Sequence, residues 1–411
     1  TNTYWDYLTT IDTIEENDPV DNCTNIPEGK NTPAGSDFYD GQIVEKGGQG
    51  YTLRTGTSPS SRAPNVWTCD PDIALCNGGL EVFNASNVGT LDPNDISWAI
   101  GYDVDDEDKD DNRTEMRPSV HGDIVHSQPV ARDYAGDILN PEVVVFYGGN
   151  DGMLRAINGN QSTEHADVSG VEAGEEFWAF MPPEFYGEIN RIRVNEDLIK
   201  FPASGPTEGV GSPGDPKGYG MDGPLSLFEF DIDGDDDDDS VLFAGMRRAS
   251  RTIYSFDVTS KTAPELLWKI GCPSLDPNDP TGCTDGMEEI GQTWSRVGVT
   301  YAEGYADNSG ELKPLVIVGG GYDICEDMDD GSVVNNDCGT TKGNLIYLLD
   351  AVTGSVVNTF STARSVPGAV TVVPISDDDP RIAYAYAVDT GGNVYRFSGG
   401  TYGSGPGDAS Y

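Results

Sequence analysis

One strand-pair pattern recurs in this chain, and it restricts the fold more than any other feature. Four segments carry it, as in "EVVVFYGGNDGMLRAINGN", and they cover residues 142–160, 239–260, 313–355 and 380–400. Each begins with an apolar strand, turns tightly, and continues as a strand in which apolar and aromatic residues alternate. The turn is Gly-rich in three of the four segments. Alternation with period two is typical of β-strands, and Gly supplies the positive φ that tight hairpins need.

A strand pair that recurs with loops of variable length favours a β-propeller. Each blade is a small sheet that cannot bury its faces alone, so several blades pack radially. A β-sandwich of unrelated hairpins is the alternative. Helix is expected to be minor, and the best candidate is residues 183–192, "PEFYGEINRI", which begins with a proline suited to a first turn. We therefore predict a mostly β chain with a propeller architecture.

The chain divides into three parts by composition. Residues 1–60 are rich in Asn, Thr, Asp, Pro and Gly and have little periodicity, so we expect an extended lead-in that packs along the propeller. Residues 61–400 hold the repeated strands. Residues 401–411 are rich in Gly and Ser and are expected to form a flexible tail.

The charge of the chain excludes several classes of function. Lys and Arg total 24 against 70 for Asp and Glu, which gives a formal net charge of −46. Such a charge repels phosphates and anionic lipids, so nucleic acid is not expected as a partner. No apolar run approaches the roughly 18 residues that a membrane span needs, so no membrane insertion is expected. Divalent cations and basic surfaces are attracted instead.

Six of the seven cysteines fall into close pairs, which predicts the disulfides Cys69–Cys76, Cys272–Cys283 and Cys325–Cys338. No Cys-x-x-Cys motif or histidine cluster accompanies them, so a zinc site is poorly supported. Disulfides that close loops place a protein outside the cytoplasm. Cys23 is left over, and its partner stays open.

The stretch "DIDGDDDDDS" (231–240) has the spacing of a calcium loop. Ca²⁺ takes six to eight oxygen ligands, which a tight turn supplies from alternate positions. Counted from the first aspartate, positions 1, 3, 5 and 9 supply carboxylates and position 7 a backbone carbonyl, and Gly234 permits the bend. The predicted ligands are Asp231, Asp233, Asp235, Asp237 and Asp239. Leu242 stands where an EF-hand has its bidentate Glu, so the loop is not of that type. A solvated acidic turn is the alternative.

Two further acidic stretches are weaker candidates for calcium. In "DVDDEDKDD" the corresponding positions are Asp103, Asp105, Glu107, Lys109 and Asp111. The charge of the lysine opposes a bound cation, although its backbone carbonyl remains a ligand. The insertion 325–338 is also acidic, with irregular spacing.

Several segments, in this order along the chain, together resemble the C-terminal propeller of the PilY family of type IV pilus proteins. They include "RPSVHGDIVHSQPV" (117–130), "FWAFMPPEFYGEINRIR" (177–193), "VLFAGMRRASRTIYSFDVT" (241–259), "TWSRVGV" (293–299) and "GNLIYLLDAVTG" (343–354). The resemblance implies a modified propeller of about seven blades with long loop insertions. It also implies a protein exported through the periplasm to the cell surface or pilus tip.

The resemblance further implies a non-enzymatic function in pilus assembly, control of retraction and surface adhesion. The expected partners are minor pilins, the pilus tip, and a host or abiotic surface. PilY-type propellers bind calcium through an Asp-x-Asp-x-Asp-x-x-x-Asp loop, which residues 231–239 match. In the family that loop precedes the blade similar to "AYAYAVDTGGNVYRFS". Here only "SDDDP" (376–380) stands before that blade, and its spacing is wrong for the loop, so either the site has moved in this chain or one of the two acidic stretches is not a calcium site.

Two other functions compete with this one. "LLDAVTGSVV" is similar to the Asp-x-x-Thr-Gly turn of quinoprotein dehydrogenases, but the chain has no Cys-Cys dipeptide and no Trp after the turn. A secreted calcium protein without a pilus is the second alternative. We expect His121, Asp123 and His126 to be structural, because on a strand the first two share a face and the third points away. The aromatic residues of the repeated strands are expected to pack between blades.

Overall fold

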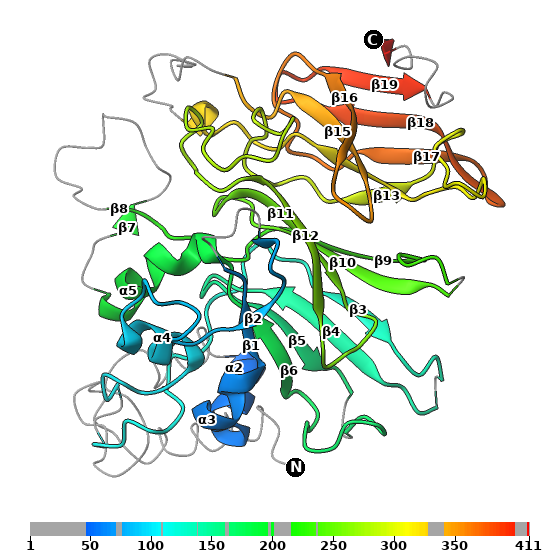
Figure 1. Ribbon diagram of the computed structural model, residues 1–411. Coiled ribbons are helices and arrows are strands. Elements are labelled where there is room, and N and C mark those ends of the chain that lie inside the picture. Colours follow the sequence, from blue (N-terminus) through cyan, green and yellow to red (C-terminus); the bar gives the residue numbers. More distant parts are fainter. Residues whose placement is uncertain are drawn as a thin grey trace, which may run out of the picture.

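The computed structural model describes residues 47–70, 76–107, 110–137, 139–160, 164–195, 199–200, 215–235, 237–327, 341–398 and 409–410. These residues form four main β-sheets that follow one another in sequence and lie next to one another in space (Figure 1). We number them sheet 1 to sheet 4. A short parallel pair, β7 (Ile199–Lys200) with β8 (Asp215–Pro216), lies apart from them.

Each sheet contains a four-stranded antiparallel meander, which is the size and topology of a propeller blade. In sheet 1 the meander is β3 (Val130–Asp133), β4 (Val143–Gly148), β5 (Leu154–Asn158) and β6 (Glu176–Phe180). Sheet 2 consists of β9 (Leu225–Phe230), β10 (Asp239–Gly245), β11 (Arg251–Asp257) and β12 (Glu265–Cys272). Sheet 3 consists of β13 (Gly298–Thr300), β14 (Leu315–Gly319), β15 (Leu345–Asp350) and β16 (Val356–Ser361). Sheet 4 consists of β17 (Thr371–Ser376), β18 (Asp379–Val388), β19 (Val394–Ser398) and β20 (Ala409–Ser410).

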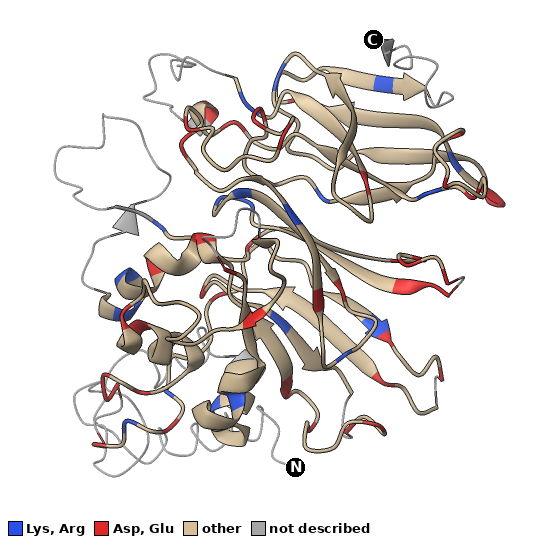
Figure 2. Ribbon diagram, in the orientation of Figure 1, with Lys and Arg blue, Asp and Glu red and all other residues tan. Residues whose placement is uncertain are grey.

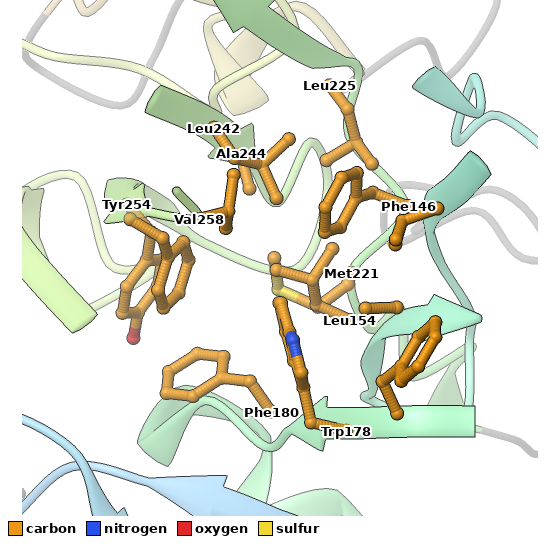
Figure 3. Packing of buried hydrophobic residues seen from close by; sticks show 14 of the residues in the cluster. Phe146, Leu154, Trp178, Phe180, Met221, Leu225, Leu242, Ala244, Tyr254 and Val258 are labelled. Atoms are coloured by element: carbon orange, nitrogen blue, oxygen red, sulfur yellow. The ribbon is translucent and has the colours of Figure 1, made fainter. Parts of the chain in front are cut away.

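Successive sheets pack face to face through buried side chains. Between sheets 1 and 2 the core brings Trp178 and Phe180 against Tyr254 and Phe256 (Figure 3). Separate apolar clusters fill the spaces between sheets 2 and 3 and between sheets 3 and 4. The first strands of neighbouring sheets also meet, since β3 lies against β9 and β13 against β17. The sheets therefore pack on one another in sequence order, as consecutive blades do.

The four predicted strand pairs are all confirmed, as β4–β5, β10–β11, β14–β15 and β18–β19. Their aromatic residues, among them Tyr254, Tyr347 and Tyr395, are buried in the cores between sheets, as expected. The predicted helix is present as the 3₁₀ turn η4 (Pro183–Phe185) followed by α5 (Tyr186–Val194). Within the described residues the sheets do not close into a ring. The number of blades, about seven, therefore remains a prediction.

The segment before the meander of sheet 1 forms small elements that pack on that sheet. Its helices are α2 (Gly47–Gly56), α3 (Pro59–Arg62), η2 (Ala63–Asn65) and α4 (Pro93–Ile100), and its strands are β1 (Val66–Thr68) and β2 (Glu81–Val82). Strand β1 extends sheet 1 by pairing in parallel with β6. Arg62 is buried and donates to both oxygens of Glu176, at 2.7 and 3.2 Å.

Two terminal predictions fall mainly outside the described residues. Of the expected lead-in 1–60, the structure describes only the part from residue 47 onwards. Of the expected tail 401–411, it describes only β20, which pairs with β19. No helix among the described residues has the length and apolarity to cross a membrane. The 3₁₀ turn η5 (Ile324–Asp327) follows sheet 3's β14 and begins the acidic insertion, most of which lies outside the described residues.

Candidate metal centre

The loop between β9 and β10 is held in shape by its own aspartates. Asp231 accepts hydrogen bonds from the backbone N–H of Asp233 (3.1 Å) and of Gly234 (2.7 Å). Asp233 in turn accepts from the N–H of Asp235 (3.2 Å), and Gly234 has a φ of +85°. Such bonds to the residue two positions ahead are Asx turns, which bend the chain within a few residues. The local sequence therefore dictates a tight loop.

Asp239 closes this loop because it is also the first residue of β10. Its Cα pairs with Phe230, the last residue of β9, and one carboxylate oxygen accepts from the N–H of Ile232 at 3.1 Å. The other oxygen accepts from the hydroxyl of Thr259 at 3.2 Å. A rigid strand end thus holds one carboxylate against the start of the loop.

The result is a group of three carboxylates that face one another. One oxygen from each of Asp231, Asp233 and Asp239 lies within 4.8 Å of the others. Two oxygens on the same Ca²⁺ ion, at 2.3–2.6 Å from it, are separated by no more than about 5 Å. Among the described residues these are the acidic side chains that converge as a metal site would require. Asp235 and Asp237, also predicted as ligands, are not in this group.

Electrostatic repulsion within the loop is the cost of this arrangement. Asp235 beside it, with smaller contributions from burial and from Asp239 and Asp231, raises the pKa of Asp233 above its ordinary value. A raised pKa means that the ionised form is disfavoured by its neighbours. A divalent cation would reverse this effect, because it neutralises the carboxylates that repel one another.

The second predicted loop has a different arrangement. Asp105 forms a two-point ion pair with Arg193 of α5, with both N···O distances at 2.7 Å. Asp103 is fully buried and accepts from the backbone N–H of Glu107. Glu107 accepts from the indole of Trp98. These carboxylates already have protein partners and are not brought together.

Asp111 and Lys109 are the other two predicted ligands in that second loop. Asp111 has a positive φ of 66°, and its N–H bonds to Asp106. Lys109 lies outside the described residues. Calcium binding at this second loop stays a prediction, and the first loop has the geometry that favours it.

The predicted disulfides Cys69–Cys76 and Cys272–Cys283 are present. Cys325 is disulfide-bonded as well, and its predicted partner Cys338 lies outside the described residues, as does Cys23.

The histidine segment has structural contacts throughout. The ring of His121 is buried, with Nδ1 2.7 Å from the carbonyl oxygen of Gly122 and Nε2 2.8 Å from the Tyr147 hydroxyl. Burial, with the nearby Arg155 guanidinium, lowers the pKa of His121 to about 4, so the ring is neutral at physiological pH. Asp123 lies 2.7 Å from the amine of Lys217.

His126 has a different partner from His121, because its Nδ1 lies 2.7 Å from the carboxylate of Asp222. The sequence did not point to Asp222, whose carboxylate is buried 96 residues further along the chain.

A comparison with protein-family models places this fold among known proteins. Residues 121–403 match the model of the PilY1 beta-propeller domain. The chain belongs to the PilY1 β-propeller family. The resemblance inferred from the sequence is therefore confirmed, and this PilY-type chain has its candidate metal loop inside the matched region. No curated protein matches the sequence.

The solved structures that are similar to this PilY-type chain include the following three. The C-terminal domain of Pseudomonas aeruginosa PilY1 is 20% identical with a TM-score of 0.38, and the match covers 62% of this chain and 38% of that one. BamB from Moraxella catarrhalis is 16% identical (TM-score 0.24; 62% and 42% covered). Sqt1 from Saccharomyces cerevisiae is 11% identical (TM-score 0.32; 69% and 48% covered). The chain thus spans less than half the length of each of these three proteins.

Proposed function

We propose that this chain is the propeller part of a pilus-associated protein that supports type IV pilus assembly, opposes retraction and contributes to surface adhesion. The single observation that carries the proposal is the match of residues 121–403 to the PilY1 beta-propeller family. The proposed partners are minor pilins at the pilus tip and a host or abiotic surface. The proposed location is the cell surface or pilus tip, after export through the periplasm.

Two features of the chain support this location. The disulfides Cys69–Cys76 and Cys272–Cys283 close short loops, and such bonds persist in oxidising compartments. The charge of −46 gives strong self-repulsion at low ionic strength, which an exposed surface protein in saline surroundings would have screened. Neither feature requires a catalytic role, and the proposed function is binding and assembly.

We further propose that calcium binds the β9–β10 loop and modulates this function. The convergence of Asp231, Asp233 and Asp239 supports the idea. Calcium would fix the loop and, through Asp239, the first residue of β10. Strand β10 is central in sheet 2 and packs against both neighbouring sheets through Leu242 and Phe243, so ordering its start would stiffen the centre of the domain.

The proposal is tested in the organism that encodes the chain. Deletion of the gene for this chain should remove surface pili, counted by electron microscopy. Additional deletion of the retraction motor should restore them. The full-length protein should co-purify with pili sheared from the wild type. Complementation with Asp378→Asn, an exposed aspartate outside the loop, should restore pili. Normal pili after deletion, with the protein absent from the sheared fraction, would instead support a secreted calcium protein without a pilus.

A further inference from the structure

The turn between β10 and β11 carries backbone strain that its counterparts avoid. Arg247 in this turn has a φ of +53°. The corresponding turns of sheets 1 and 4 place Gly152 (+92°) and Gly392 (+81°) in the same left-handed region, and Gly321 (+94°) follows β14 in sheet 3. An L-residue with a long side chain is disfavoured there by about 1 kcal/mol or more. An arginine where three sheets use glycine implies that its side chain has a role.

That side chain is stacked on an aromatic pair supplied by the next sheet. The Arg247 guanidinium carbon lies 3.9 Å from the centroid of the Trp294 ring. Trp294 and Tyr322 are themselves stacked, with centroids 4.4 Å apart and planes 22° from parallel. Arg248 adds a second guanidinium 4.9 Å from the Trp294 centroid. A guanidinium held over an indole ring is restrained in position, and the N–H groups that have no partner remain available for a planar anion.

The protein supplies this guanidinium with little counter-charge. Its side chain is only 17% exposed, and its nearest carboxylate, Asp222, is 3.5 Å from Nη1. Asp222 also binds His126 at 2.7 Å and lies 3.4 Å from the amide nitrogen of Asn150. Among the described residues only Nη1 of Arg247 has polar partners, so Nε and Nη2 have none. Burial, against the opposing effect of Asp222, lowers the pKa of Arg247.

The position of this stack separates it from the candidate metal centre. The β9–β10 loop and the β10–β11 turn lie at opposite ends of β10, which has seven residues and is therefore about 20 Å long. In Figure 2 the first end is marked by acidic residues and the second by basic ones. Next to the stack, the segment that ends at His126 exposes Ile124 (45%) and Val125 (55%). A cationic group with apolar neighbours is unusual on a chain of net charge −46.

We propose that Arg247, stacked on Trp294, binds a single carboxylate of a partner polypeptide, with apolar neighbours of that carboxylate lying on Ile124 and Val125. A planar carboxylate matches the two free N–H groups of a guanidinium edge in a bidentate pair. The overall negative field disfavours a polyanion, whereas one carboxylate in an apolar context suffers little repulsion at physiological salt. The carboxylate is either a chain terminus or an acidic side chain.

Three fluorescein-labelled hexapeptides test this site by fluorescence anisotropy in 0.15 M NaCl. The first is made of Gly and Ser and ends in two leucines with a free carboxylate; the second is its C-terminal amide. The third is an amide with one glutamate between leucines. We expect the first or the third to bind at least about tenfold more tightly than the second, since a charge-assisted bidentate pair is worth at least that factor. Which of the two binds identifies terminus or side chain.

Arg247→Gly is the decisive variant, because glycine adopts the positive φ without strain and the fold is retained. It should weaken binding of the preferred peptide by about tenfold or more, with an unchanged or raised thermal midpoint. Arg247→Lys should bind with intermediate affinity, because it keeps the positive charge but loses the two parallel N–H groups that pair with a carboxylate. Arg381→Ala, at the other end of the sheets, should bind like the wild type. Equal binding of all three peptides, no saturable binding, or full binding by Arg247→Gly would each overturn the proposal.

Discussion

The indole Nε1 of Trp268 donates a hydrogen bond to the backbone oxygen of Ala351, 2.9 Å away across the boundary between sheets 2 and 3. Trp178 donates in the same way to the backbone oxygen of Lys261, at 3.1 Å, across the boundary between sheets 1 and 2. Each pair is separated by 83 residues in the sequence. Two successive sheets are therefore joined by the same bond, from a last-strand tryptophan to the turn between the last two strands of the next sheet.

Replacing either tryptophan by phenylalanine should destabilise the domain by a similar amount. Trp268→Phe and Trp178→Phe each remove a buried hydrogen bond, leave a carbonyl unpaired and reduce packing between sheets. We expect about 1–3 kcal/mol for each change, measured by urea denaturation. Trp67→Phe is the matched control, because the buried Nε1 of Trp67 has no hydrogen-bond partner among the described residues. If the control costs as much as the other two, the docking bonds contribute nothing specific.

Gly354 should be difficult to replace, because it packs against Trp268 and Ile270 of sheet 2. Its φ is +72°, and an added Cβ would lie 2.9 Å from both Trp268 and Ile270. Gly354→Ala should therefore cost backbone strain and overpacking, together about 2–4 kcal/mol in urea denaturation. Gly392→Ala has the strain without the contact, since its φ is +81° with nothing within 4 Å of an added Cβ, and should cost about 1 kcal/mol. Equal losses would refute the contribution of the Trp268 contact.

The sequence predicted the parts of the fold that have a local signal. Strand pairs such as β4–β5 were found because their alternation and the glycine of the turn occur together within 20 residues. The last strands were less evident. In β12, for example, the five residues from Trp268 to Cys272 are all buried, so the alternation that marks a half-exposed strand is lost. The tryptophan bonds join positions 83 residues apart, and no local pattern marks them.

The candidate site shows the same division between local and distant contacts. The loop at 231–239 was identified from the spacing of its aspartates, since Asx turns and ligand positions are properties of a short segment. The loop at 103–111 is similarly rich in acidic residues, but its Asp105 forms an ion pair with Arg193, which lies 88 residues further along the chain. The stack of Arg247, Trp294 and Tyr322 comes from three separate loops. Its one signal in the sequence was the turn with arginines where the other three segments have glycine.

Calcium should stabilise the domain through the β9–β10 loop. A ligand at 100 times its dissociation constant adds about 2.7 kcal/mol to the free energy of unfolding. We therefore expect the thermal midpoint to rise by several degrees between EGTA and millimolar Ca²⁺, measured by differential scanning fluorimetry. Asp233→Asn and Asp239→Asn should abolish this rise, because each removes a converging carboxylate. Asp378→Asn should keep the full rise. A wild-type midpoint that is the same in EGTA and in calcium would contradict the site.

Stability should fall as the pH falls from 6.5 towards 4, and His121 should cause part of the loss. Burial lowers its pKa in the folded protein to about 4, whereas the unfolded chain titrates near 6.5. Between these values the unfolded state binds a proton that the folded state does not, so acid favours unfolding. For His121 alone this amounts to about 2–3 kcal/mol between pH 6.5 and 4.5.

Urea denaturation of the wild type and of His121→Gln at pH 7, 5.5 and 4.5 measures this contribution. The variant should be less stable at pH 7, because the contacts of the ring with Gly122 and Tyr147 are lost. It should lose less stability on acidification, so the two curves converge towards pH 4.5. His165, whose pKa burial also lowers, is present in both proteins and cancels in the comparison. Parallel curves over the whole range would show that His121 is protonated equally in the folded and unfolded states.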